Sequence, residues 1–148
     1  MKAVIQRVSS ASVLVEKNVA GEIGQGLLVF LGVEAGDTKE QAQKLAGKIA
    51  KLRIFTDENQ KTNLSSEDIG GELLVVSQFT LCADCRKGNR PSFVNAAPPD
   101  IAEEIYEYFI NVCKPKFKKV QSGVFGAAMT VSIVNEGPFT LVIEGKNT

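Results

Sequence analysis

The first third of the chain predicts β-structure from its pattern of apolar and polar residues. Residues 3–8 and 12–16 are rich in β-branched residues and partly alternate between apolar and polar, which is typical of strands. Residues 16–24 continue the second strand as a short hairpin. Residues 26–33, GLLVFLGV, are almost continuously apolar and therefore predict a buried strand.

The pattern changes to a helical period twice. Apolar side chains recur at helical spacing in residues 36–52 and again in residues 100–113. Asp37 or Thr38 is the expected N-cap of the first helix, and Asp100 caps the second. The expected buried faces are Ala42, Leu45, Ala46, Ile49 and Leu52 in the first helix and Ile101, Ile105, Tyr108, Phe109 and Val112 in the second.

The remaining segments predict further strands and one long loop. Residues 53–65 are typical of a strand that runs into a turn, residues 71–83 of a buried strand, and residues 118–144 of two or three more strands. Residues 84–99 form a polar loop with three prolines, and such loops are often functional or mobile. With no repeat or linker, we expect a single domain over residues 1–148. The expected fold is α+β: a curved, mostly antiparallel sheet or partly closed β-barrel covered by two helices.

The charge balance is neutral, because 17 Lys and Arg residues offset 17 Asp and Glu residues in a chain of 148. This balance argues against a protein coated in basic charge that binds nucleic acid nonspecifically. Two basic runs remain, at residues 86–90 and 114–119, and such runs are usually solvated surface. The chain starts without the apolar core of an export signal, and no run reaches membrane-spanning length. We therefore expect a soluble, cytoplasmic protein without membrane contact.

Histidine is absent, which removes the usual general base, the Ser-His and Cys-His nucleophile pairs and every His metal site. The three cysteines are Cys82, Cys85 and Cys113. The first two form a lone C-x-x-C, which lacks the four ligands of a structural zinc site and the strand-to-helix setting of a thioredoxin-like pair. We expect neither a metal nor a cofactor, and the odd cysteine count fits a reducing compartment.

Two short stretches carry candidate chemistry. In SQFT, the Ser77 and Thr80 hydroxyls would need an activating base, and neither a histidine nor an adjacent lysine supplies one. The two hydroxyls can equally serve as hydrogen-bond partners for backbone groups where a strand ends. The backbone amides exposed at such a strand end can also converge on one oxygen atom and form an oxyanion hole. In NEGPFT, the pair Gly137-Pro138 predicts either a plain turn between two strands or a cis peptide, which costs little before proline.

Together these stretches resemble the D-aminoacyl-tRNA deacylase family, and the resemblance covers the whole chain. It rests on the opening MKAVIQRVSSASV, the GLLVFLGV strand, the KGNRPSF and AAPP segments and two family signatures. The signatures stand here as SQFTL, residues 77–81, and NEGPFT, residues 135–140. Phe139 departs from the smaller aliphatic residues common in the family. A related branch with relaxed chirality carries an aromatic there, but it alters the first signature, which is intact here.

The resemblance implies a homodimeric hydrolase of D-aminoacyl-tRNA with its active sites at the subunit interface. Gly137 and Pro138, joined by a cis bond, would reach into the pocket of the partner and capture the substrate's α-amino group with their carbonyls. An L side chain would need the space that they fill and is excluded. Glycine is expected to enter, including glycyl-tRNA mischarged on tRNA-Ala. The implied role is chiral proofreading in translation.

The same resemblance implies the catalytic arrangement. Four consecutive residues surround the terminal adenosine and the scissile ester: Ser77, Gln78, Phe79 and Thr80. The Phe79 amide is the expected electrostatic contact at the reacting centre, and the substrate's ribose 2′-hydroxyl helps to activate water. Thr80 as a nucleophile is the competing view. Arg7 is expected to brace the Gly-Pro segment, and the basic loop at residues 86–90 to contact the acceptor phosphates of the tRNA.

Two other classes of function stay open. The first is a dimeric binding module that holds an RNA 3′ end without cleaving it, and catalysis by metal-free protein would exclude it. The second is a hydrolase of free N-acyl D-amino acids, and deacylation that requires the ribose 2′-hydroxyl would exclude that one.

Overall fold

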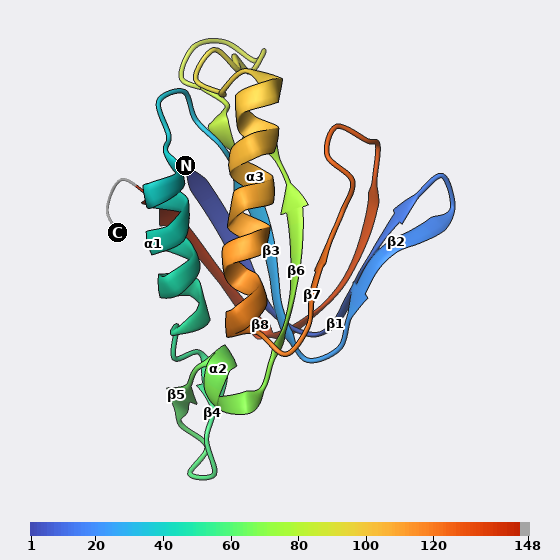
Figure 1. Cartoon of the computed structure of the whole chain (residues 1–148), viewed down its shortest axis with the longest axis vertical. Helices are drawn as coiled ribbons and strands as arrows, with labels where there is room; N and C mark the ends of the chain where they lie inside the picture. Colours follow the sequence, from blue (N-terminus) through green and yellow to red (C-terminus); the bar gives the residue numbers. More distant parts are fainter. Residues whose placement is uncertain (146–148) are drawn as a thin grey trace.

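The protein, seen in a computed structural model that describes residues 1–145, is organised around one curved sheet (Figure 1). Strand β1 is paired with β8 along one side. Along its other side it is paired first with β3 and then, in its second half, with β2. Beyond β3, the sheet continues with β6 and then β7. The strands of this sheet are β1 (Lys2–Val15), β2 (Asn18–Ile23), β3 (Gly26–Gly32), β6 (Glu72–Ser77), β7 (Val120–Ser122) and β8 (Thr130–Glu144).

Two long helices and several short elements complete the fold. The long helices are α1 (Lys39–Ala50) and α3 (Pro99–Cys113), and a single short turn forms α2 (Ser66–Ile69). Two 3₁₀ turns, η1 (Phe79–Cys82) and η2 (Lys114–Lys116), follow β6 and α3. A small ribbon of β4 (Phe55–Thr56) and β5 (Thr62–Leu64) follows α1. Among residues 1–145, no helix is long and apolar enough to cross a membrane.

The sheet is mixed, because the helices are inserted as crossovers. β1 pairs antiparallel with β2, β3 and β8, whereas β3 with β6 and β6 with β7 are parallel. Parallel neighbours need a long return connection, and α1 and α3 lie in the two that are required here. The prediction of a curved, partly closed barrel covered by two helices is confirmed, and the parallel pairs are the feature that the strand pattern did not show.

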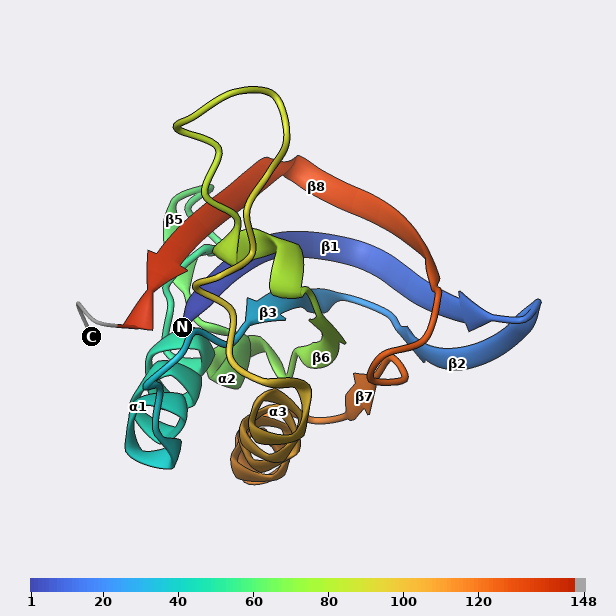
Figure 2. The same ribbon diagram turned by 90° about the horizontal axis from the view of Figure 1, so that it is seen from above.

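Glycine permits the sheet to curl until β2 approaches β7. A Cβ atom at Gly21 would lie 2.8 Å from the carbonyl oxygen of Ser122, closer than side chains approach backbone. A Cβ at Gly26 would lie 1.9 Å from the Glu72 carbonyl oxygen. At these two glycines, the backbones of neighbouring segments pass closer together than a side chain would allow. Figure 2 shows the resulting curved sheet from above.

The apolar runs of β3 and β6 are buried on both faces. Leu27, Val29 and Leu31 belong to the core under the helices, whereas Leu28 points into a second apolar cluster on the opposite face. In β6, odd and even positions divide between the two clusters in the same way. A strand covered on both sides needs no polar face, which explains the unbroken apolar sequence. Residues 71–83 are not one strand, however, because pairing with β3 stops at Ser77 and η1 follows.

Helix α1 confirms its prediction in register and cap. Thr38 is the N-cap, and its hydroxyl accepts a hydrogen bond from the Gln41 amide. The Gln41 side chain accepts in return from the Thr38 amide, which completes a capping box. The four predicted core residues within the helix are buried: Ala42, Leu45, Ala46 and Ile49.

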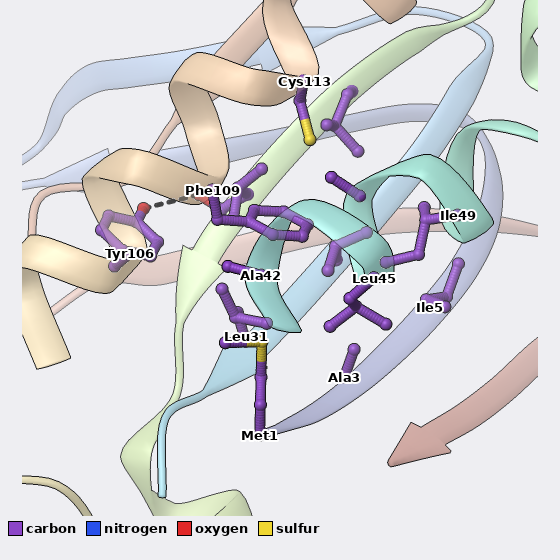
Figure 3. Packing of buried hydrophobic residues seen from close by; sticks show 14 of the residues in the cluster. Met1, Ala3, Ile5, Leu31, Ala42, Leu45, Ile49, Tyr106, Phe109 and Cys113 are labelled. Carbon is purple, nitrogen blue, oxygen red and sulfur yellow. Dashed lines mark hydrogen bonds between the residues drawn. The ribbon is translucent and has the colours of Figure 1, made fainter. Parts of the chain in front are cut away.

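Helix α3 forms where expected, but its predicted cap is wrong, and its predicted buried face is confirmed only for Ile105 and Phe109. The helix begins at Pro99, so Asp100 lies in its first turn and does not cap it. Ile101 is 43% exposed, and Tyr106 rather than Tyr108 faces the sheet. The core face is Ala102, Ile105, Tyr106, Phe109 and Cys113. Figure 3 shows Tyr106, Phe109 and Cys113 in this packing. The small Ala102 and Cys113 made this face look weak in sequence.

The Tyr106 hydroxyl has a partner on the buried face of α3. It donates a hydrogen bond of 2.9 Å to the carbonyl oxygen of Val75 in β6, so its polar end is satisfied inside the core. Burial raises the pKa of Tyr106 to about 12, which keeps the phenol neutral at every ordinary pH. Tyr108 instead lies near the surface, where its hydroxyl donates to Gln43.

Candidate functional site

The end of β6 opens into a cavity of about 480 Å³. One wall is formed by Ser77, Gln78 and Phe79, where the strand stops and η1 begins. The opposite walls are the first turn of α3 and the segment 125–131, which leads from the loop after β7 into the start of β8. Apolar walls with a few polar groups at one end are the usual form of a small-molecule site.

The backbone turns sharply at this strand end. The Gln78 amide donates to the carbonyl oxygen of Leu31 at 2.9 Å, which is the last bond that ties the segment to β3. The Leu81 amide then donates back to the Gln78 carbonyl oxygen, and the 3₁₀ turn follows. Between them, the Phe79 amide has no hydrogen-bond partner within the described part of the chain. A free amide beside a cavity is available to an oxygen of a bound molecule.

The Thr80 hydroxyl has no base beside it. Its partner within residues 1–145 is the side-chain amide nitrogen of Gln78, which donates to Oγ1. An amide NH₂ group is a donor and does not remove a proton. Thr80 is exposed and does not line the cavity. The geometry therefore supplies no activation for a nucleophilic hydroxyl.

Gly137 and Pro138 are joined by a cis peptide bond, and the interpretation as a turn between two strands is wrong. β8 runs continuously through them from Thr130 to Glu144. Its register against β1 is interrupted here: Asn135 pairs with Val8 and Thr140 with Gln6, so residues 136–139 bulge out opposite Arg7. A β-bulge of this kind redirects backbone groups out of the ladder.

The polar ends of NEGPFT close this bulge. The Asn135 side-chain oxygen accepts a hydrogen bond of 2.9 Å from the Phe139 amide. Its side-chain nitrogen donates to the Thr140 hydroxyl at 3.0 Å, and Gln6 donates to the same hydroxyl at 3.2 Å. The Asn and Thr of the motif are therefore explained by backbone architecture, and they hold the exposed Gly137 and Pro138 in a defined position.

Arg7 supports the bulge from β1. Its Nε donates to the Glu136 carbonyl oxygen at 3.1 Å, and its Nη1 donates to the Ile54 carbonyl oxygen at 2.5 Å. The guanidinium carbon lies 4.9 Å from the centre of the Phe139 ring, a cation-π contact. Two directed bonds and a stacked ring require the planar fork of arginine, which lysine does not reproduce.

The two signatures do not meet within one chain. Ser77, Gln78 and Phe79 line the cavity, whereas Gly137 and Pro138 are exposed and do not line it. Arg7 belongs with the bulge and is likewise absent from the cavity wall. The sequence reasoning missed the cavity's other walls, notably Phe125 and Met129. These lie in GVFGAAM, a Gly-rich segment that shows neither helical nor strand periodicity and so gives no local signal.

The C-x-x-C pair is divided by burial. Cys82 is buried and its thiol donates to the Val33 carbonyl oxygen at 3.4 Å, whereas Cys85 is exposed. Burial raises the pKa of the Cys82 thiol, and it raises the pKa of the Cys113 thiol to about 12. Both side chains therefore stay protonated thiols. Within residues 1–145, no group of three or more acidic, cysteine or histidine side chains is placed to hold a metal ion.

Thiol labelling tests this division. In native protein, we expect 5,5′-dithiobis(2-nitrobenzoate) to modify one thiol per chain rapidly, and all three only after unfolding in guanidinium, because Cys85 is exposed whereas Cys82 and Cys113 are buried. The Cys85→Ser variant should show no rapid reaction. Rapid release of two equivalents by wild-type protein would contradict the burial of Cys82.

Comparisons with known proteins agree over nearly the full length. Residues 4–144 match the family described as D-Tyr-tRNA(Tyr) deacylase. A D-aminoacyl-tRNA deacylase of Thermosipho africanus is 59% identical and covers 99% of this chain and 98% of its own. One of Desulfatibacillum aliphaticivorans is 57% identical, with 99% and 100% covered. A solved structure named c-Myc DNA Unwinding Element Binding Protein superposes with a TM-score of 0.92 at 41% identity and covers 97% and 98%.

Proposed function

Because this chain belongs to the D-Tyr-tRNA(Tyr) deacylase family, we propose that it hydrolyses the ester bond of D-aminoacyl-tRNA and releases the D-amino acid and free tRNA. The enzyme is a hydrolase, and its role is chiral proofreading in the cytoplasm, where translation takes place. The observation that carries the mechanism is the separation of the two signatures: a cavity with a free amide on one surface, and a braced, exposed Gly-Pro bulge on another.

A homodimer joins these two parts. β8 has 15 residues and pairs with β1 alone among the strands described, so its other edge is unpaired. It also exposes Val134 at 56% and Val142 at 70%. A long edge strand with exposed apolar side chains is a surface that another chain covers. In a two-fold dimer, the bulge of one subunit enters the cavity of the other and the reverse holds by symmetry.

The bulge then acts as the chiral filter. The carbonyls of Gly137 and Pro138 accept hydrogen bonds from the substrate's α-ammonium group and occupy the space that an L side chain would need. A D side chain points away from them, so many D-amino acids are accepted. Glycine has no side chain to reject, and glycyl-tRNA mischarged on tRNA-Ala is also hydrolysed.

Catalysis uses the backbone of this chain and the RNA itself. The free Phe79 amide stabilises the negative charge that develops on the ester oxygen. Ser77 and Gln78 position the terminal ribose at the cavity rim. The ribose 2′-hydroxyl helps to activate water, which suits a chain that has no histidine and no base near Thr80. Neither a metal nor a cofactor has a role in this mechanism.

Replacing Thr80 separates this mechanism from nucleophilic catalysis. We expect Thr80→Ala and the isosteric Thr80→Val to lower kcat/KM by less than about tenfold, because removing an essential proton-transfer or nucleophilic group costs roughly 10²-fold or more. Single-turnover deacylation of D-tyrosyl-tRNA measures the rate, and circular dichroism and tRNA binding verify the fold. Complete loss of activity in a folded, tRNA-binding variant would contradict this mechanism and make Thr80 an essential catalytic group.

The proposed function is tested by a paired assay with chelator-treated protein. D-tyrosyl-tRNA and L-tyrosyl-tRNA are incubated separately, and we expect release from the D substrate alone. Release from both would mean that the filter is relaxed, with Phe139 the first residue to change. Release from neither would leave an RNA-binding module. A D-tyrosyl ester on 2′-deoxyadenosine-terminated tRNA should be resistant, and its rapid hydrolysis would contradict the role of the 2′-hydroxyl.

A further inference from the structure

An exposed aromatic pair lies at the edge of the cavity. The rings of Phe79 and Phe93 meet edge to face with their centres 5.1 Å apart. Phe79 is 55% exposed and lines the cavity, whereas Phe93 is 39% exposed and lies outside it. Aromatic side chains normally bury most of their surface, so a pair held open to solvent indicates a surface that something covers.

The backbone around Phe93 is anchored. Ser92 and Asp84 exchange two backbone hydrogen bonds of 2.7 and 3.0 Å, which close the loop between them into a bridge. Immediately after the ring, the Ala96 amide donates to the Phe93 carbonyl oxygen at 3.0 Å, and the Asn95 carbonyl oxygen accepts from Ala35 at 2.9 Å. The backbone that carries Phe93 is therefore anchored. Figure 1 shows this loop at the end of the molecule where α3 begins.

The same loop carries two cations, Lys87 and Arg90, that have no ion-pair partner among residues 1–145. Arg86 forms a two-pronged ion pair with Asp84, which lowers the pKa of that carboxyl group to about 2. Lys87 and Arg90 are exposed and form no ion pair within residues 1–145. An exposed ring beside unneutralised cations is the combination that binds single-stranded nucleic acid, by stacking a base and attracting its phosphate.

We propose that Phe93 stacks on the base of the nucleotide that precedes the terminal adenosine in the unpaired 3′ end of tRNA, with Lys87 and Arg90 facing its phosphates. The inference rests on the proposed function, in which the cavity holds the terminal aminoacylated nucleoside. The next base emerges past Phe79 and meets Phe93. The platform distinguishes a tRNA end from a free aminoacyl nucleoside, and it accepts any base because every base has a π-face.

Two small substrates test this platform by kinetics. D-tyrosyl-adenosine ends at the cavity, whereas D-tyrosyl-(cytidylyl-3′,5′-adenosine) adds the one nucleotide that reaches Phe93. We expect wild-type protein to prefer the dinucleotide in kcat/KM. Phe93→Ala should reduce this ratio by about fivefold or more, and Phe93→Trp should retain it. Val94→Ala, which truncates the neighbouring, 79% exposed apolar residue, should leave the ratio unchanged. An unaltered ratio in Phe93→Ala would overturn the inference.

A binding measurement separates this inference from the proposed function. Fluorescence anisotropy of a 5′-labelled cytidylyl-cytidylyl-adenosine trinucleotide reports binding even if no ester is cleaved. We expect the wild-type protein and Phe93→Trp to bind the trinucleotide more tightly than adenosine, and Phe93→Ala to lose this preference. Such a result would support the platform even if the wild-type protein hydrolysed neither substrate. Analytical ultracentrifugation of the same variants measures their oligomeric state. If Phe93→Ala dissociated the dimer, the ring would be a subunit contact and the proposal would be overturned.

Discussion

Gly137→Ala is expected to lower deacylation of D-tyrosyl-tRNA by about 100-fold while the protein stays folded. Gly137 has φ of +132°, a region that residues with a Cβ rarely adopt. The added Cβ would also lie 3.0 Å from the Phe139 nitrogen and 3.1 Å from Arg7 Nη2. The bulge must therefore shift, and its carbonyls would leave the place where the substrate's α-amino group binds. The same strain should lower the free energy of unfolding by about 1–3 kcal/mol, so circular dichroism must verify that the variant is folded.

The matched control is Gly36→Ala. Gly36 also has positive φ, +86°, but nothing lies within 4 Å of a Cβ added there. This variant has the conformational cost of a left-handed alanine, roughly 1 kcal/mol, without displacing the bulge. Its kcat/KM should equal that of wild-type protein. If Gly137→Ala kept full activity and full discrimination against L-tyrosyl-tRNA, the bulge would not be the chiral filter.

Phe109→Ala is expected to lower the free energy of unfolding by about 3–5 kcal/mol. Its ring is fully buried between α1, α3 and the sheet and ranks among the largest side chains without solvent contact (Figure 3). Truncation leaves a void that the helices and strands around it fill only in part. Urea denaturation followed by circular dichroism measures the loss, at one fixed protein concentration because dimerisation contributes to apparent stability.

Tyr108→Ala is the control for the rotation of α3. Tyr108 lies one residue away, packs only at the margin of the core and places its hydroxyl against Gln43. Its truncation should cost only about 1 kcal/mol, in the ordinary range for such positions. Equal losses in the two variants would mean that the helix is rotated from the orientation described, with Tyr108 rather than Tyr106 toward the sheet.

The candidate site was visible in sequence only as two separate motifs. NEGPFT looks locally like a turn, since Gly-Pro usually marks one, and nothing nearby in the chain indicates otherwise. Its meaning comes from Arg7 and Gln6, more than 120 residues away in sequence, which pair with the strand on both sides of the bulge. The cavity could not be predicted from sequence either, because its walls from α3 and the segment 125–131 meet the end of β6 only in the folded chain.

By itself, the sequence determined what depends on neighbouring residues. The helical period of α1, its N-cap to within Asp37 or Thr38, the buried strands β3 and β6 and the exclusion of histidine chemistry follow from local patterns and side-chain inventory. The tertiary structure alone decided which face of α3 is buried, which strands pair in parallel and where the two signatures lie. These depend on contacts between distant segments, such as the hydrogen bond from Tyr106 in α3 to Val75 in β6, which no local sequence pattern shows.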